Sequence, residues 1–268
     1  LPTMPTGKSH VSFSEIKCWK ECSYRHKLMH VEKIDVFKPS PYLDFGTAVH
    51  EGCETLLETR KVDKKKLLND ITSAWEKHGF GEPEWYEKMP GWYKHAPVDE
   101  WKSWAKNMWS DVLPFLDETF PDWKPIKAEE YLYEEIEGKP IKFKGFIDLV
   151  IKTNDGKFHI IDWKTCSWGW DAKKKADKFI TYQLTLYKKF WCEKYEVDPK
   201  LVETHFALLK RTAKKNNVEI FRVTSGPRKT ENATKLLTNA LIHISKQHHV
   251  KDRRSCSKCE FNKTEFCK

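Results

Sequence analysis

The chain has no run of about 18 apolar residues, the length that a helix needs to cross a bilayer. Its first residues also lack the charged and then apolar segments of a secretory signal peptide. These absences exclude a spanning helix and lead us to expect an intracellular protein, cytoplasmic in a bacterium or in a phage-infected cell. There is no internal repeat and no low-complexity linker, so a single domain is expected from the 268 residues.

A disulfide framework is also missing. The eight cysteines are scattered through the chain, which is typical of a protein from a reducing compartment. Hydrophobic residues make up 39% and charged residues 32%, a composition that folds. The formal net charge of +9 favours an anionic partner such as nucleic acid or a membrane surface, without deciding between them.

The predicted elements come in the order helices, three strands, helix, two strands, helix. Hydrophobic periodicity predicts helices over 12–34, 44–61, 63–79 and 171–195 and after Pro227. Alternation predicts strands over 129–136, 141–151, 157–165, 202–210 and 216–224. The turn at Asp155-Gly156 is a strong hairpin signal, so the first three strands form an antiparallel meander. A mixed sheet flanked by helices is the natural packing of these elements.

The stretch Ile160–Thr165 (IIDWKT) ends an apolar run with an acid and a base two residues apart. Side chains alternate across a strand, so Asp162 and Lys164 face one side of the sheet and Trp163 faces the other. Two interpretations are open, an ion pair on an exposed strand or half of an active site. Taken alone, the pair favours the surface ion pair.

Asp148 ends the sequence GFID in the middle strand of the meander. Facing residues of antiparallel strands lie within about 5 Å, so a modest register would place Asp148 beside Asp162. Two carboxylates at that distance repel each other unless a cation lies between them. Hard oxygen ligands suit Mg²⁺ or Mn²⁺, ions that activate water and neutralise a transferring phosphoryl group. Lys164 would then orient the water or stabilise the pentavalent phosphate.

Two further pairs each stand one helical turn apart, Gly46 with His50 and Gln183 with Tyr187. Each pair alone is a weak signal. The ordered set is Gly46-x3-His50, Gly145-x2-Asp148, Asp162-x-Lys164 and Gln183-x3-Tyr187. Together these motifs closely resemble the RecB-like branch of the PD-(D/E)XK nuclease superfamily. The resemblance runs through most of the chain and leaves only the tryptophan-rich stretch unmatched.

The resemblance implies an α/β, restriction-endonuclease-like fold, with a mixed central sheet flanked by helices. It also implies that His50, Asp148 and Asp162 hold a divalent metal ion, Mg²⁺ or Mn²⁺, together with the main-chain carbonyl of Trp163. The ion pair at the end of the strand is therefore better interpreted as a metal ligand and a catalytic lysine.

The catalytic residues implied by the same resemblance are Asp148, Asp162, Lys164, Gln183 and Tyr187. Lys164 matches the residue that assists the attacking water. Gln183 and Tyr187 match a motif that supports the site and the DNA backbone.

The terminal sequence CSKCEFNKTEFC holds Cys256, Cys259 and Cys267, and a metal site there needs a fourth ligand from Cys18 or Cys22. The layout resembles the AddB-type and CRISPR-associated exonucleases, in which one early and three late cysteines bind a 4Fe-4S cluster. Cys22 matches the early position better, because it directly precedes SYRHKL. The last gap is longer than in that subset, so Zn²⁺ and free cysteines stay open as alternatives.

Basic runs at 173–178, 209–217 and 250–254 are individually best interpreted as solvated surfaces, but beside a nuclease core at least one is expected to contact phosphates. The many tryptophans could stack unpaired bases, although core packing is favoured for most of them. Exceptions are expected among Trp85, Tyr86, Trp92 and Tyr93.

The sequence therefore predicts a metal-dependent DNA nuclease, an exonuclease on single-stranded DNA ends in recombination, repair or replication. Endonuclease activity stays open. Residues 1–268 are expected to form one domain, with N-terminal helices and a tryptophan-rich helical cap over 1–125, the PD-(D/E)XK core over 126–250 and a cysteine-cluster tail over 251–268. A cap over the site would favour a threaded strand and hence exonuclease action.

Two other classes of protein are possible. One is a catalytically idle DNA-binding subunit of a recombination or CRISPR-adaptation complex, and the intact acidic set argues against it. The other is a structural metal-binding protein built around the terminal cysteines, which leaves the acidic set unexplained. Helicase motifs are absent, so a helicase or recombination partner would be a separate chain.

Overall fold

The computed structural model describes residues 4–36, 39–88 and 97–268. Its strands are β1 (His10–Ser12), β2 (Lys124–Glu135), β3 (Lys142–Lys152), β4 (Phe158–Cys166), β5 (Val202–Lys210) and β6 (Val218–Val223). Its α-helices are α1 (Phe13–Glu21), α2 (Ser23–His26), α3 (Pro41–Thr59), α4 (Lys64–His78), α5 (Pro83–Lys88), α6 (Val98–Thr119), α7 (Ala172–Ala176), α8 (Lys178–Tyr195) and α9 (Pro227–Ser245). Helices of other types in the described residues are the π-helix Lys27–Val31 and the 3-10 helices Pro199–Leu201 and Arg253–Lys258.

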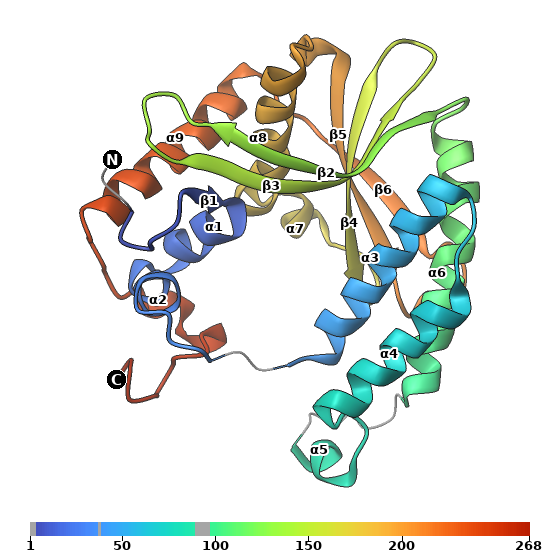
Figure 1. The fold of residues 1–268 in the computed structure, drawn as a ribbon, viewed down its shortest axis with the longest axis horizontal. Coiled ribbons are helices and arrows are strands. Elements are labelled where there is room, and N and C mark those ends of the chain that lie inside the picture. The colour runs from blue at the N-terminus through green and yellow to red at the C-terminus, as the bar shows by residue number, and fades with distance from the viewer. Residues whose placement is uncertain (1–3, 37–38, 89–96) are drawn as a thin grey trace.

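The centre of the fold is a mixed sheet, which has six strands in the described part of the chain (Figure 1). Its order is β1-β3-β4-β5-β6, and β2 also pairs with β3. β2, β3 and β4 form an antiparallel meander, whereas β5 is parallel to β4 and β1 is parallel to β3. The predicted α/β fold with a mixed sheet flanked by helices is confirmed.

Helices α1, α8 and α9 cover one face of the sheet. α8 begins after Asp177, whose carboxylate accepts a hydrogen bond from the Phe179 N–H and so caps the helix. The apolar faces of α8 and α9 then pack on β3, β4 and β5. This core cluster includes Ile147, Ile160, Leu184, Phe190, Phe206, Leu237 and Leu241.

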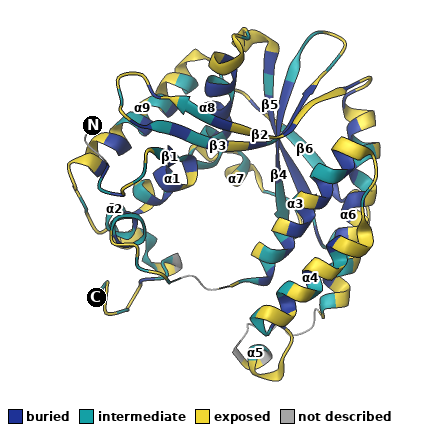
Figure 2. Cartoon of the chain, in the orientation of Figure 1, coloured by how far each residue is buried: buried dark blue, intermediate teal, exposed yellow. Residues whose placement is uncertain are grey.

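Helices α3 and α6 cover the other face, α4 packs on these two helices, and all three leave their outer sides exposed (Figure 2). Aromatic residues of this layer share a core cluster with Leu149, Ile161 and Trp163 of the sheet. The buried tryptophans of the layer are Trp75, Trp101, Trp109 and Trp123, so core packing accounts for these four rings. The layer therefore packs directly on the sheet, and the division at 125 and 250 stays a prediction.

Three local features differ from the sequence prediction. The first predicted helix breaks at Cys22, whose backbone is extended and whose thiol caps α2 by accepting the Arg25 N–H. The helix expected over 171–195 is divided at Asp177, the cap of α8. β1 was not predicted, because three residues are too few for a periodic signal.

A buried polar cluster holds the N-terminal segment against α1. Lys8 Nζ lies 3.1 Å from Glu15 Oε2 and 3.3 Å from His30 Nδ1, and His26 Nε2 lies 3.1 Å from Glu15 Oε1. The ammonium of Lys8 can only donate, so His30 Nδ1 accepts and the imidazole is neutral. Burial lowers the pKa of His30 from 6.5 to about 4.

Acidification is expected to destabilise the fold through His30. The unfolded chain binds a proton at His30 near pH 6.5 and the folded chain only near pH 4, so this stability is complete above 6.5 and is lost as the pH falls towards 4. Urea unfolding at several pH values measures the slope of the free energy of unfolding against pH. His30→Asn is expected to flatten it, and His248→Asn, which removes an exposed imidazole, to leave it unchanged. An unchanged slope in His30→Asn would contradict the assignment.

Candidate active site

β3 has a fork on the edge opposite β2. Residues 142–144 pair with β1 and residues 149–152 pair with β4, so positions 145–148 lie between two diverging strands. The last pair of the β3–β4 ladder joins Leu149 to Ile161. The next residues in this register are Asp148 and Asp162, so the structure brings the two acids together as the sequence predicted.

At the fork, the Asp148 side chain takes the place of a backbone carbonyl as a hydrogen-bond acceptor. Its Oδ2 accepts a hydrogen bond from the Trp163 N–H at 2.6 Å. The N–H and C=O of a strand residue point towards the same neighbouring strand, so the Trp163 carbonyl also faces the fork. The Trp163 ring lies on the far face of the sheet, in the cluster under α3 and α6. The predicted alternation of Asp162, Trp163 and Lys164 is therefore what the structure shows.

Asp162 has an incomplete set of partners. Its Oδ1 accepts a hydrogen bond from Gln183 Nε2 at 3.3 Å. Its Oδ2 lies 2.5 Å from Lys164 Nζ but accepts no well-aligned hydrogen bond from the described residues, although it is buried. Burial raises the pKa of Asp162 to about 6, against the opposing charge of Lys164. A buried carboxylate oxygen without a well-aligned hydrogen bond fits a divalent cation, which balances the charge of the second acid, Asp148.

His50 reaches the fork from α3. Its Nδ1 lies 3.7 Å from Asp148 Oδ1. Burial would lower the pKa of His50, but the nearby carboxylates of Asp148 and Asp162 outweigh burial and raise it. Gly46, one turn earlier on α3, lies next to Thr165 at the end of β4. The Gly46–His50 spacing thus brings one face of α3 to the fork.

Lys164 lies on the same side of β4 as Asp162 and stays charged. Burial would lower its pKa, but the charges of Asp162 and Asp148 raise it. From α8, Gln183 Nε2 also donates to Tyr187 Oη at 3.1 Å. A Cβ at Gly145 would lie 2.7 Å from the Tyr187 ring, so glycine is needed where α8 crosses β3. All the predicted catalytic residues therefore meet at one fork.

Two hollows flank the fork. One of about 700 Å³ is lined by α3, Glu129 and Thr165, and it contains His50. The other, of about 340 Å³, contains Gln183 and Tyr187 and is lined by residues of β1, α1 and β3. An extended chain could therefore approach the two acids from both sides.

Sequence reasoning missed three residues near this site. Glu54 and Glu129 line the larger hollow, and burial together with the charge of Glu129 raises the pKa of Glu54. Glu54 stands one helical turn after His50, and this spacing could have revealed it. Trp168, just beyond β4, is 81% exposed. Nothing in its local pattern distinguishes it from the buried tryptophans.

The four predicted cluster cysteines lie around one cavity of about 250 Å³, lined by Cys22, Cys256, Cys259 and Cys267. Cys22 Sγ accepts hydrogen bonds from the N–H groups of Arg25 and Asp252 at 3.5 and 3.4 Å. Other contacts tie the C-terminal tail to α2, including the pairing of Arg25 with Glu260 at 2.8 and 3.0 Å.

Cys18, the alternative fourth ligand, does not line this cavity. Its thiol instead donates to Met29 Sδ at 3.8 Å. Burial raises the pKa of Cys18 to about 12, which disfavours the thiolate that a metal requires.

Three side chains of the basic runs interact with other residues of the fold. The Arg211 guanidinium is buried against the rings of Tyr42, Trp101 and Trp104, at 4.6, 4.8 and 5.4 Å. Lys175 and Lys210 both pair with Glu219, at 2.5 and 3.6 Å. These three cations stabilise the fold locally.

Few of the aromatic residues expected to stack on bases can be placed. Trp85 packs against Phe80, with 5.4 Å between ring centroids. Trp92 and Tyr93 lie outside the described residues, and the Tyr86 side chain is not among those described. Base stacking by these residues stays a prediction.

Comparison with known proteins agrees with this geometry. Residues 10–264 match the PD-(D/E)XK nuclease superfamily. The chain belongs to this superfamily, and its RecB-like motifs fit that placement. Among curated proteins, none matches the chain.

Solved structures similar to the chain include the following two. One, described as a "putative exonuclease" from Eubacterium rectale, has a TM-score of 0.56 at 11% identity, over 96% of this chain and 89% of its own. The other, SSO0001, has a TM-score of 0.36 at 13% identity, over 93% of each chain. The first likeness supports the fold, and the family supports a nuclease that uses divalent metal ions. Among the described residues, no helix has both the length and the apolar character to cross a bilayer.

Proposed function

We propose that the protein is a Mg²⁺- or Mn²⁺-dependent deoxyribonuclease that digests single-stranded DNA from its ends. The observation that carries this proposal is the fork, where Asp148 and Asp162 meet His50 and Lys164 and where a buried oxygen of Asp162 lacks a hydrogen bond. A salt bridge alone has no need of a second acid and a histidine at the same place.

Each side chain has a defined role in hydrolysis. Asp148, Asp162, His50 and the Trp163 carbonyl would hold the metal ion. The bound ion supplies the charge that activates water and offsets the developing negative charge on the phosphate.

The other side chains of the fork prepare the site. Lys164 is held charged by the two acids, so it can orient the attacking water and stabilise the phosphate as charge develops. Gln183 fixes the orientation of Asp162 and is itself in contact with Tyr187.

A stripe of exposed side chains on β2 and β3 supports a single-stranded substrate. Phe146 and Tyr131 are cross-strand partners, 47% and 43% exposed, with ring centroids 5.1 Å apart. Tyr133 stacks on Tyr131 at 5.8 Å. Lys144 lies over Phe146 and Lys142 over Tyr133. Aromatic faces alternating with ammonium groups are suited to unpaired bases and their phosphates.

The stripe leads to the fork, because Phe146 and Lys144 line the same hollow as Gln183 and Tyr187. A single strand lying on the stripe would place its end at the acids. Duplex DNA buries its base faces by stacking, so it could not use these rings in the same way.

Phe146→Ala is expected to weaken single-strand binding by about 5- to 150-fold, the loss of one base stacked on an aromatic ring. Binding to duplex DNA should change much less. Fluorescence anisotropy measures the affinities for single-stranded and duplex DNA, in a catalytically inactive variant so that neither substrate is cut. Tyr195→Ala is the matched control, because Tyr195 is also 47% exposed but lies at the end of α8, where its ring packs against Trp191 outside the stripe. Equal losses for single-stranded and duplex DNA would contradict the stripe.

The same strand offered in linear and in circular form tests exonuclease action. An exonuclease degrades the linear strand and leaves the circle intact, whereas equal cutting of both forms would show an endonuclease. Binding without cutting of either form would favour the idle DNA-binding subunit instead.

We also propose that the tail cysteines hold a 4Fe-4S cluster through Cys22, Cys256, Cys259 and Cys267. Four cysteine ligands are the usual set for such a cluster. In a zinc site the sulfurs would lie about 3.8 Å apart. Among the described residues, the one group of three ligand atoms within 4.8 Å of one another contains no cysteine, so the four thiols do not lie at the spacing of a zinc site. The cluster would join α2 to the C-terminal tail.

Protein purified without oxygen is expected to carry about four iron atoms per chain. Cys256→Ser should lose this iron and the associated visible absorbance, while Cys18→Ser should keep both. Iron content and absorbance of the two variants measure this. Zinc in place of iron would contradict the cluster. Loss of iron in Cys18→Ser, with iron retained in Cys22→Ser, would show that Cys18 rather than Cys22 is the fourth ligand.

Single-strand digestion serves recombination, repair and replication, and a helicase or recombination protein is the partner that we propose. An intracellular location remains part of the proposal.

A further inference from the structure

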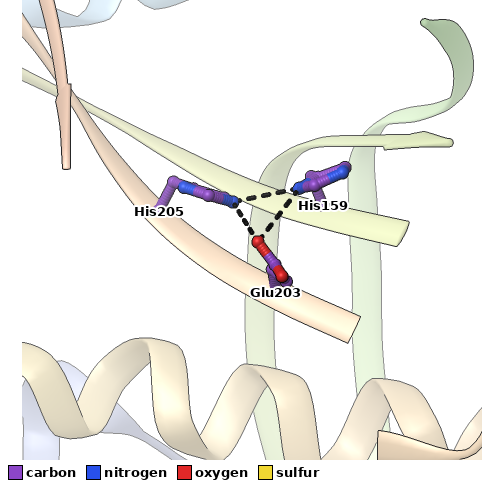
Figure 3. A group of neighbouring side chains, drawn as sticks. All are labelled: His159, Glu203 and His205. Carbon is purple, nitrogen blue, oxygen red and sulfur yellow. Dashed lines mark hydrogen bonds and ion pairs between the residues drawn. The ribbon is translucent and has the colours of Figure 1, made fainter. Parts of the chain in front are cut away.

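A second group of metal-ligand side chains lies outside the fork. His159 comes from β4, and Glu203 and His205 come from β5 (Figure 3). The parallel register places His159 directly opposite Glu203. His159 Nδ1 lies 3.1 Å from His205 Nε2, and Glu203 Oε2 lies 3.9 and 4.0 Å from these two nitrogens. Three ligand atoms therefore converge on one point.

A hydrogen-bond relay fixes the tautomer of His159. The Thr153 hydroxyl donates to Asp155 Oδ1 at 2.6 Å, so its oxygen must accept the 3.1 Å hydrogen bond from His159 Nε2. The proton of His159 is then on Nε2, and its Nδ1 accepts the 3.1 Å hydrogen bond from His205 Nε2, so a bound metal ion would take the place of that His205 proton. Metal-bound histidines are usually oriented by such a bond from the second ring nitrogen.

Glu203 is held with one oxygen towards the histidines. Its Oε1 lies 3.3 Å from Lys157 Nζ and 3.4 Å from an Arg222 guanidinium nitrogen. Its Oε2 faces the two imidazoles and accepts no hydrogen bond from the described residues. Two cations orient the carboxylate, and the inner oxygen is left for another partner.

The histidines are buried against Phe120, whose ring centroid lies 4.6 Å from His159 and 5.4 Å from His205. Burial lowers the pKa of both imidazoles, to about 3 for His205, so they are neutral at physiological pH. Neutral imidazole is the form that binds a metal ion.

We propose that His159, Glu203 and His205 form a zinc site separate from the nuclease centre. Two nitrogens on a tetrahedral zinc ion lie about 3.3 Å apart, close to the observed 3.1 Å. Glu203 Oε2 must move inwards by roughly half an ångström to complete the set. Two imidazoles and one carboxylate suit zinc, whereas Mg²⁺ prefers oxygen ligands.

The site would act on stability rather than on catalysis. His159 precedes Asp162 by three residues on β4, but it shares a sheet face with Ile161 and Trp163, and Asp162 faces the opposite side. The ion would join β4 to β5 and, through Thr153, to the turn after β3. A zinc ion here would therefore stabilise the pairing register between β5 and β4, the strand that carries Asp162 and Lys164.

Zinc titration of the chelator-treated full chain tests the proposal. Excess Mg²⁺ is kept present to occupy the fork, bound zinc is counted by equilibrium dialysis with elemental analysis, and Tm is recorded. Wild type is expected to bind one more zinc ion than His205→Asn and to gain Tm that the variant does not. Thr153→Val should weaken this zinc affinity by about 10- to 100-fold.

His243→Asn is the matched control, because His243 and His248 form an exposed imidazole pair at 3.4 Å on the other side of the fold. It should bind as much zinc as wild type. Co²⁺ separates this site from the cysteines, since a site without sulfur gives no thiolate charge-transfer band.

The proposal is overturned if Glu203→Gln and His205→Asn bind as much zinc as wild type with the same gain in Tm. The proposal is also overturned if the only signal of added Co²⁺ is a thiolate charge-transfer band and this band is unchanged in both variants. If His205→Asn does not fold, the milder Thr153→Val and Glu203→Gln variants decide the result.

Discussion

Lys164→Ala is expected to reduce DNA cleavage by about 10²- to 10⁴-fold, the range for removal of a positioned proton-transfer or charge-stabilising group. Lys164 is half-buried beside Asp162 and is kept charged by the two acids of the fork. The acids themselves remain in the variant, so metal binding should persist. Single-turnover cleavage of labelled single-stranded DNA, with metal-induced changes in Tm beside it, measures the two effects separately.

Lys235→Ala is the matched control for this variant. Lys235 pairs with Glu231 at 2.5 Å, the same distance as the Lys164–Asp162 pair, but on the exposed surface of α9. Its cleavage rate should match that of wild type. A Lys164→Ala enzyme that cuts at the wild-type rate would remove Lys164 from the mechanism and return the pair to a structural role.

Asp148→Asn is expected to abolish both the metal-induced rise in Tm and DNA cleavage. An ion that binds only the folded protein must stabilise it, and loss of a carboxylate ligand removes that gain. Cleavage should fall by about 10³-fold or more, since a metal ion supplies several kcal/mol of transition-state stabilisation. An asparagine carbonyl can still accept the Trp163 N–H, so the fold is expected to survive.

Asp44→Asn is the matched control for this second variant. Asp44 also lies beside a histidine, with His78 Nδ1 at 2.8 Å, but this pair joins α3 to α4 outside the fork. Its response to Mg²⁺ and Mn²⁺ should equal that of wild type. A metal-induced rise in Tm that persists in Asp148→Asn would place the ion elsewhere.

The arrangement of some fork residues could be predicted from local signals, whereas their common role came from the resemblance of the whole ordered set to a family. Strand alternation alone put Asp162 and Lys164 on one face and Trp163 on the other, and the structure shows this arrangement. Helical spacing likewise put Gln183 and Tyr187 side by side. The register that joins Asp148 to Asp162 follows from a short hairpin, whose turn fixes the pairing.

Features that depend on distant parts of the chain were not predictable. Tyr131 and Phe146 alternate like any surface residues, and their exposure follows from helices that do not extend over this part of the sheet. β1 is only three residues long and exists because β3 offers it an open edge. No local pattern encodes either fact.

The zinc ligands were hidden for the same reason. His159 and Glu203 are separated by 44 positions, and a parallel pairing of two strands joined through a helix leaves no mark on the sequence near either residue. Burial under Phe120, which keeps both imidazoles neutral, is a property of the packed structure.

Digestion of 5′-labelled and 3′-labelled single-stranded DNA, with Mg²⁺, with Mn²⁺ and with chelator, tests the central claim most directly. We predict cleavage that requires the metal ion and is lost in Asp148→Asn, with a product ladder that reveals the polarity of digestion. Stable binding of DNA by the wild-type chain without cleavage in either metal would contradict the account and leave a DNA-binding protein with an idle nuclease fold.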